Sequence, residues 1–173
     1  MSEQIENKMK EIRLEKVVLN MGVGKSGDAI EIAKKALDQI SGEKSNARNA
    51  KKAQRDWGVR KNEPIGVAVT VRNDGAKDLL KKLFEAKGNK IKEKSIDREG
   101  NLSFGILEHI DIPGIKYDPK IGILGLNVTV NLTRPGYRIK VRSKHKAKVG
   151  NAHKIKPVEA KDYLTKEFGV SIN

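Results

Sequence analysis

The sequence predicts a single domain of the α+β class, in which helices cover one face of a β-sheet. Two segments, 65–72 and 124–133, alternate strictly between apolar and polar residues, which is typical of strands with one buried face. Two further segments, at 29–41 and 75–87, repeat apolar residues at helical spacing. The length of 173 residues fits one domain. A long basic loop and a basic C-terminal extension complete the predicted architecture.

The first strand and the first helix lie on either side of a glycine-rich turn. The aliphatic run at 17–19 predicts a strand that ends at Asn20, before several glycines. Asp28 is expected to cap the following helix, because Glu31 stands three residues further on as in a capping box. Gly42 is expected to end that helix.

The second strand and the second helix follow a basic segment. Segment 44–62 shows no sustained period and holds seven Lys and Arg against the single acid Asp56, so it is predicted to be a long basic loop or a hairpin. Strand 65–72 comes next. We expect a helix after Asp74 that closes at Gly88.

The last part of the chain adds two strands, a second basic segment and a terminal helix. Strands are predicted at 102–107 and 124–133. Segment 134–156 holds nine Lys and Arg and no acid, and Pro157 marks the start of a helix. We therefore divide the chain into a flexible tail at 1–12, a core α+β domain at 13–133, and a basic arm with a C-terminal helix at 134–173, packed on the same domain.

The composition favours a polyanion partner and excludes several chemistries. Lys and Arg number 36 against 22 Asp and Glu, which gives a net charge of +14. The absence of cysteine excludes disulfides, thiolate nucleophiles and Cys-containing zinc sites, and the three histidines are scattered, so we expect no metal and no cofactor. No apolar stretch is long enough to span a membrane and the N-terminus is polar, so we expect a cytoplasmic protein without a membrane partner.

A short glycine motif raises the question of nucleotide hydrolysis. Segment 21–26 ends in Gly-Lys-Ser like a Walker P-loop, but Leu19 stands where that motif needs its first glycine. A nucleotide-dependent enzyme that uses Lys25 is therefore only a distant alternative. The glycines are expected to form a tight turn whose N–H groups meet an RNA phosphate. No other catalytic pattern is present, and we predict that the protein is not an enzyme.

The two basic segments and the polar side of the strands each allow two interpretations. The basic segments either bind phosphates or form a solubilising surface. Polar residues alternate with the apolar ones along the strands and would point away from the helices; they are Asn20, Thr70, Arg72, Asn127, Thr129, Asn131 and Thr133. They either read the shape and the 2′-hydroxyls of an RNA or simply face water.

Aromatic residues are scarce, at 4% of the chain, which argues against a platform that stacks many bases. Trp57 is the exception because it lies inside the basic segment 44–62, away from any apolar period. It either stacks on one exposed base or anchors the loop. Shape and backbone recognition of a folded RNA is the better prediction.

Four segments resemble, in order and spacing, the universal large-subunit ribosomal protein five family. They are RLEKVVLNMGVG at 13–24, ISGEK at 40–44, GVRKNEPIGVAVTVR at 58–72 and DREGNLSFGILEHIDIPGIKY at 97–117. The chain beyond Thr133 is similar to the archaeal and eukaryotic form, and the longer N-terminal helix of bacterial members is lacking. The resemblance implies an antiparallel sheet with helices packed on one side.

The resemblance also implies an RNA surface and partners. It implies a 5S rRNA-binding surface around Asn20, Met21, Gly22, Trp57, Thr70 and Arg72, to which the charge and the polar face add Arg60, Asn127 and Thr129. The basic loop is expected to contact peptidyl-site tRNA through Arg48, Lys51, Lys52 and Arg55. Large-subunit (23S-type) rRNA is expected to meet Arg134, Arg138, Arg142, Lys144 and Lys146. Family members also bridge to a small-subunit head protein.

The functional hypothesis is a non-catalytic constituent of the large ribosomal subunit. It would bind 5S rRNA and help attach it in the central protuberance, with contact to peptidyl-site tRNA. Phosphate contacts would position it and the polar face would read RNA shape. The alternative is a basic protein that binds nucleic acids without a preferred target.

Overall fold

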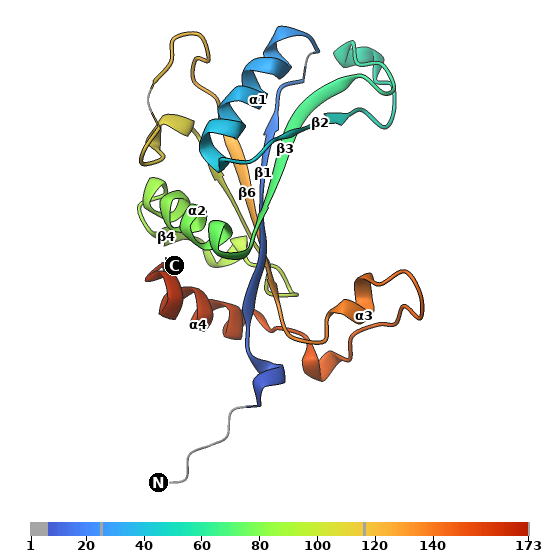
Figure 1. Cartoon of the computed structure of the whole chain (residues 1–173), viewed down its shortest axis with the longest axis vertical. Helices are drawn as coiled ribbons and strands as arrows, with labels where there is room; N and C mark the ends of the chain where they lie inside the picture. The colour runs from blue at the N-terminus through green and yellow to red at the C-terminus, as the bar shows by residue number, and fades with distance from the viewer. Residues whose placement is uncertain (1–6, 25, 116, 173) are drawn as a thin grey trace.

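A computed structural model describes residues 7–24, 26–115 and 117–172 of the chain (Figure 1). The predicted tail therefore lies partly outside the described residues. The strands are β1 (Arg13–Gly22), β2 (Asn46–Asn49), β3 (Pro64–Arg72), β4 (Lys90–Ile91), β5 (Leu102–Ile106), β6 (Leu126–Thr133) and β7 (Ser171–Ile172). The α-helices are α1 (Asp28–Ser41), α2 (Asn73–Ala86), α3 (Arg138–Val141) and α4 (Pro157–Phe168).

The main sheet has five strands in the order β2-β3-β1-β6-β5, and every neighbouring pair is antiparallel. Long strands of alternating polarity occupy its centre, because β1 pairs with β3 on one side and with β6 on the other. The α+β class and the antiparallel sheet are thus confirmed. A short parallel pair of β4 with β7 was not predicted, since two residues per strand are too few to show a period.

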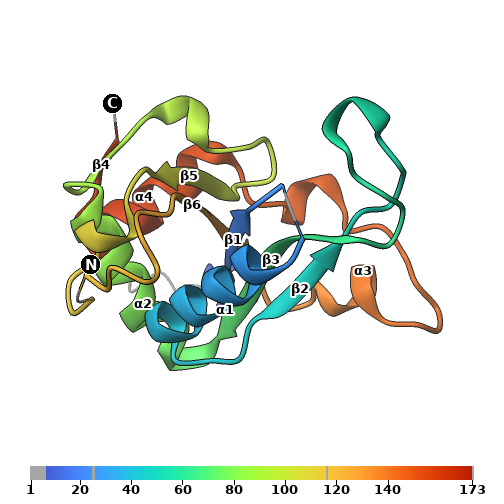
Figure 2. The ribbon, with the colours of Figure 1, turned by 90° about the horizontal axis from the view of Figure 1, so that it is seen from above.

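The core lies between the sheet and the helices. The apolar alternates of the central strands, such as Leu19, Val69 and Val128, are at most 3% exposed. Leu37 of α1, Leu80 of α2 and other apolar residues of α1, α2 and α4 pack into the same cluster. Figures 1 and 2 show these helices stacked against the sheet. Burial of this apolar surface drives the two layers together.

Both helix starts differ from the predictions. Asp28 is the first residue of α1, and its expected cap position is taken by Gly27 at φ 99°, a conformation that an aspartate rarely adopts. The second helix begins at Asn73, ahead of Asp74, because β3 runs into α2 without a loop and Arg72 at its end takes the cap position. The end of α1 at Gly42, with φ 68°, is as predicted.

The first basic segment forms a hairpin, one of the two structures that its sequence allowed. Strand β2 pairs with β3, and Gln54 pairs with Val59 beyond the strands. The backbone N–H of Asn62 donates to Ala50 O at 2.9 Å, and the N–H of Ala50 donates to Glu63 O at 2.8 Å. We call residues 50–62 the hairpin tip. These bonds give a segment without an apolar core a defined backbone path.

The second basic segment packs partly on the domain. Residues 134–156, here called the C-terminal segment, contain α3 and then lead into α4, which begins at Pro157 and is followed by Gly169 as predicted. Figure 1 shows the hairpin tip and α3 at opposite ends of the sheet but on the same side of the molecule, away from α2 and α4. No helix in the described part of the chain is long and apolar enough to cross a membrane.

Candidate RNA interface

The polar face of the sheet carries rows of side chains that cross several strands. One row runs through Asn46, Ala68, Asn20, Asn127 and Gly105, which are successive partners on all five strands. Asn20 and Asn127 are exposed, whereas their neighbours along the chain belong to the core. Directly paired residues point to the same face, so the two amides lie side by side. The predicted orientation of these residues is therefore found in the structure.

A second row lies one step further along the same face. It runs through Thr70, Val18, Thr129 and Ser103, on β3, β1, β6 and β5. The hydroxyls of Ser103 and Thr129 share a hydrogen bond of 3.0 Å. Ser103 was missed in the sequence because the five-residue strand β5 showed only a short alternation. Its pairing with β6 was the signal that sequence alone lacked.

The two rows border a shallow hollow of about 560 Å³. Asn20, Asn127, Thr129, Ser103 and Gly105 line it from three strands. The lining offers amide and hydroxyl groups, which donate and accept hydrogen bonds, and no charged side chain. Such groups suit sugar hydroxyls and phosphate oxygens that approach a flat backbone surface.

Next to β2, small residues on the polar face leave few side chains that protrude from the sheet. Arg48 is paired with Gly66, and Gly66 is paired with Gly22. A Cβ atom at Gly66 would lie 2.9 Å from Met21 O, so this glycine is required for the close approach of β1 and β3. Because Arg48 pairs with Gly66, it lies in the sheet rather than in the hairpin tip. Its predicted tRNA role therefore differs in position from that of Lys51, Lys52 and Arg55.

The structure limits two predicted RNA contacts of the glycine-rich turn, the contact through Met21 and the contact through the N–H groups of the turn. The side chain of Met21 is buried at 2% exposure, so only its main chain is accessible to a ligand. The N–H groups of Val23 and Gly24 both donate to Ile65 O, at 3.0 and 2.8 Å. These two N–H groups are therefore not available for the predicted contact with an RNA phosphate. Lys25, the residue on which the P-loop alternative depends, lies outside the described residues.

The hairpin tip exposes its positive charges. Lys51, Lys52, Arg55 and Arg60 are exposed, and within the described ranges none of them forms an ion pair. Glu63 anchors the base of the tip, because its carboxylate accepts hydrogen bonds from Ser26 Oγ and from the Arg60 N–H. These bonds, the first above all, lower the pKa of Glu63 below its ordinary value.

Trp57 ends the short 3₁₀ turn Arg55–Trp57, and its side chain is 79% exposed. Gly58 follows at φ 65°, which turns the chain back toward β3. An indole that anchored the loop would be buried against apolar neighbours. The exposure therefore favours the stacking interpretation over the anchoring one.

The C-terminal segment uses part of its charge internally. Arg134 is only 7% exposed: its guanidinium pairs with Glu159 at 2.9 Å and donates to the main-chain oxygens of His153 and Lys154. It ties the segment to α4, and we leave it out of the RNA contacts proposed below. Arg138, Arg142, Lys144 and Lys146 are exposed.

The histidine and acidic side chains in the described part of the chain do not form a metal site. His109 is buried at 1% exposure, and its Nδ1 accepts the Leu124 N–H at 3.3 Å. Among the described residues, no group of three or more His, Cys, Asp or Glu is placed to hold a metal ion. An α+β domain with an accessible polar sheet face between two basic segments has the features of the class of domains that bind structured polyanions.

Comparison with known proteins identifies the family within this class. Residues 7–60 match the family described as "Ribosomal protein L5", and residues 64–171 match the model that describes the C-terminus of the same ribosomal family. The "Large ribosomal subunit protein uL5" of Nitrosopumilus maritimus is 69% identical over 172 residues, covering 99% of each chain. The proteins of the same name from Cenarchaeum symbiosum and Pyrobaculum aerophilum are 63% and 44% identical, covering 95% of this chain and 97% and 92% of their own.

The chain belongs to the ribosomal protein L5 family, in its archaeal form. It is therefore a structural, non-enzymatic protein of the large ribosomal subunit, and its localisation is the ribosome. The resemblance seen in four sequence segments is confirmed over nearly the whole chain.

Proposed function

We propose that the protein binds 5S rRNA through the polar face of its sheet and helps attach this RNA in the central protuberance. The observation that carries the proposal is the pair of rows of amides and hydroxyls around the exposed Asn20 and Asn127 and the partly exposed Thr129, on a ribosomal protein with a net charge of +14. These groups supply hydrogen bonds to riboses and phosphates, and the flanking cations supply long-range attraction.

Arg72 and Thr70 extend the proposed surface along β3. Arg72 is exposed at the end of the strand, and its guanidinium meets Glu15 at 3.4 Å. An exposed pair of this length is weak, so an RNA phosphate competes well for the arginine. Arg60 and Trp57, at the end of the hairpin tip, and the main chain at Met21 and Gly22 complete the proposed 5S rRNA contacts.

The hairpin tip is proposed to contact peptidyl-site tRNA. Lys51, Lys52 and Arg55 belong to the hairpin tip, which extends beyond the sheet (Figure 1) on a backbone held by cross-strand bonds, and this position lets them reach a second RNA. Arg138, Arg142, Lys144 and Lys146 are proposed to meet large-subunit rRNA from the opposite end of the sheet. The two basic segments thus have different proposed partners: tRNA and part of the 5S rRNA surface for the first, and large-subunit rRNA for the second.

The test compares 5S rRNA, tRNA and an unrelated structured RNA of similar length in filter-binding titrations at about 50 and 200 mM salt. We expect 5S rRNA to keep a preference of about tenfold or more at the higher salt, equal to about 1.4 kcal/mol. Arg72→Ala and Thr70→Ala should each weaken 5S rRNA binding, whereas Lys82→Ala, on the exposed side of α2, should not. Equal binding of all three RNAs, fading together with salt, would instead favour a basic protein without a preferred target.

A further inference from the structure

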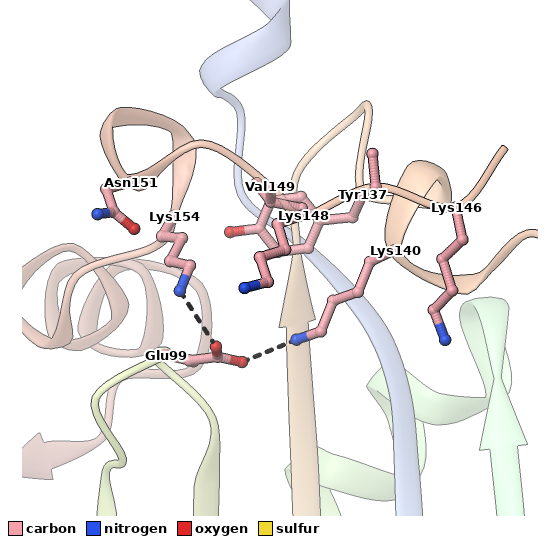
Figure 3. A pocket seen from close by; sticks show the side chains of 9 residues that line it. Glu99, Tyr137, Lys140, Lys146, Lys148, Val149, Asn151 and Lys154 are labelled. Atoms are coloured by element: carbon pink, nitrogen blue, oxygen red, sulfur yellow. Dashed lines mark hydrogen bonds and ion pairs between the residues drawn. The ribbon is translucent and has the colours of Figure 1, made fainter.

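A pocket of about 450 Å³ opens between the C-terminal segment and the turn at 97–100 that precedes β5. Figure 3 shows side chains from the segment pointing toward this turn from several directions. Lys140, Lys146, Lys148 and Lys154 line the pocket together with the single acid Glu99. The sheet-face contacts proposed above do not use it.

The charge of the pocket is arranged around the one carboxylate. Glu99 Oε2 lies 2.9 Å from Lys140 Nζ, and Oε1 lies 3.6 Å from Lys154 Nζ (Figure 3). The hydrogen bond from Lys140 is the main reason that the pKa of Glu99 lies below its ordinary value. Within the described part of the chain, Lys146 and Lys148 have no acidic partner. Four lysines therefore line a pocket that has a single acid, and only Lys140 and Lys154 are paired with it.

The walls of the pocket are aromatic and aliphatic. Tyr137 lines it, and the tyrosine hydroxyl accepts the Ile155 N–H at 3.0 Å and lies 3.3 Å from His153 O, which fixes the ring. Val149, buried at 8% exposure, lies beside it. A pocket of a few hundred Å³ with apolar walls and a few charged groups is typical of small-ligand sites. Here the charged groups are almost all cations.

We propose that this pocket binds one nucleotide, with its phosphate on the lysines and its base against Tyr137 and Val149. In the protein without the nucleotide, the Glu99 carboxylate occupies the position of the phosphate. A phosphodiester carries one negative charge and a terminal phosphate up to about two, so either competes with a single carboxylate for Lys140 and Lys154. The nucleotide is either a free mononucleotide or an unpaired residue of an RNA chain. The inference does not depend on which RNA binds the sheet face.

The proposal predicts opposite effects for two variants. Glu99→Gln removes the competing charge and should tighten nucleotide binding about threefold or more, because both of its lysines become available. Lys148→Ala, at a lysine that has no acidic partner among the described residues, should weaken binding by a similar factor. Glu85→Gln and Lys82→Ala make the same charge changes on the exposed side of α2, and they should leave the affinity unchanged.

The experiment titrates AMP, a short unstructured RNA hexamer and inorganic phosphate into the ¹⁵N-labelled full chain and follows the amide signals of Ala147 and Val149. Movement of these signals with AMP supports a free nucleotide as the source, and movement with the hexamer alone supports an RNA residue. Retained dispersion of the spectra shows that each variant is folded. If the Glu99→Gln variant does not fold, Lys146→Ala is used beside Lys148→Ala as a second variant that should weaken nucleotide binding.

Three results would overturn the proposal. The first is the absence of any shift with both AMP and the hexamer. The second is inorganic phosphate binding as tightly as either, since the base would then make no contact with Tyr137 and Val149. The third is a folded Glu99→Gln variant that binds more weakly than the native chain, since the carboxylate would then be a part of the site rather than a competitor.

Discussion

The hairpin tip and the C-terminal segment are both rich in lysine and arginine, yet they use these charges differently. In the tip, Lys51, Lys52 and Arg55 are exposed and have no acidic partner among the described residues. In the C-terminal segment, Arg134 is buried against Glu159, and two lysines share Glu99. Basic residues in a sequence therefore do not by themselves reveal how much charge remains for a nucleic acid.

The difference arises from what lies next to each segment. The hairpin tip projects beyond the sheet and meets mainly its own backbone. The C-terminal segment returns to the domain, where Ile155 is buried at 1% exposure and α4 supplies Glu159. We expect substitutions in the two segments to separate stability from RNA binding accordingly.

The largest expected effect is at the ion pair between the buried Arg134 and the partly exposed Glu159. Glu159→Ala leaves the Arg134 guanidinium buried without its carboxylate and removes the acceptor of the Lys156 N–H at the start of α4. We expect a loss of about 3 kcal/mol in the free energy of unfolding, measured by urea denaturation. Glu167→Ala, an exposed acid on the same helix, is the control. A loss below about 0.5 kcal/mol, the usual range for surface substitutions, would show that the pair does not anchor the segment.

The second expected effect concerns the place where the C-terminal segment packs on the domain, between Ile155 and Gly100. Gly100 has φ 78°, and a Cβ there would lie 2.6 Å from Ile155 Cγ2. Gly100→Ala should destabilise the protein by about 2 kcal/mol or more through backbone strain and overpacking together. Gly114→Ala separates the two, because Gly114 also has positive φ but open space around it. The measurement is the thermal unfolding midpoint of each variant. An equal decrease in both would mean that overpacking against Ile155 does not contribute to the loss of stability.

Substitutions in the hairpin tip should weaken RNA binding and leave the stability of the fold unchanged. Lys51→Gln combined with Lys52→Gln should leave the free energy of unfolding within about 0.5 kcal/mol of the native value. Under the proposed function it should weaken tRNA binding about tenfold, or 1.4 kcal/mol, and lower the salt dependence. Binding of 5S rRNA should fall less. The double variant Lys81→Gln, Lys82→Gln on α2 controls for net charge, and equal losses of both RNAs would contradict the separate roles.

The smallest expected effect is a pH dependence at Glu99. Its pKa is lowered in the folded chain, chiefly by the hydrogen bond from Lys140. The stabilisation is therefore present above the pKa of an unfolded glutamate, about 4.3, and is lost as the pH falls through the lower folded value. For an exposed pair we expect at most about 1 kcal/mol. Unfolding measured from about pH 7 to 3 should show native and Glu99→Gln proteins converging in acid; a constant difference would argue against the ion pair.

The fold class and the polar face were predictable because they depend on local periodicity. Alternation in β6 separates its buried side from its more accessible side, since successive side chains point to opposite faces. In β3 the alternation gives the two faces, but the small Gly66 and Ala68 on the polar face are buried as well. The same alternation placed Thr70, Asn127 and Thr129 on the polar face. Strand β1 extends further in both directions than its aliphatic run suggested, from Arg13 to Gly22, because pairing on both sides holds residues that have little strand propensity of their own.

Other features of the site depend on contacts between distant residues. Ser103 joins the surface only because β5 pairs with β6, and Arg48 joins it because β2 pairs with β3. Arg134 is removed from it by an acid 25 positions away, on α4, although nothing in segment 134–156 distinguishes this arginine from its neighbours. Two N–H groups of the glycine turn, those of Val23 and Gly24, are likewise occupied by Ile65 O of β3.

The elements, their buried sides, the excess of positive charge and the family could all be inferred from the chain before folding, because each is encoded in nearby residues or in total composition. Folding added which cations face solvent, which small residues let strands approach, and which lysines gather around Glu99. The availability of a charged or hydrogen-bonding group depends on its burial and on its partners, and both are set by residues that come together only when the chain folds.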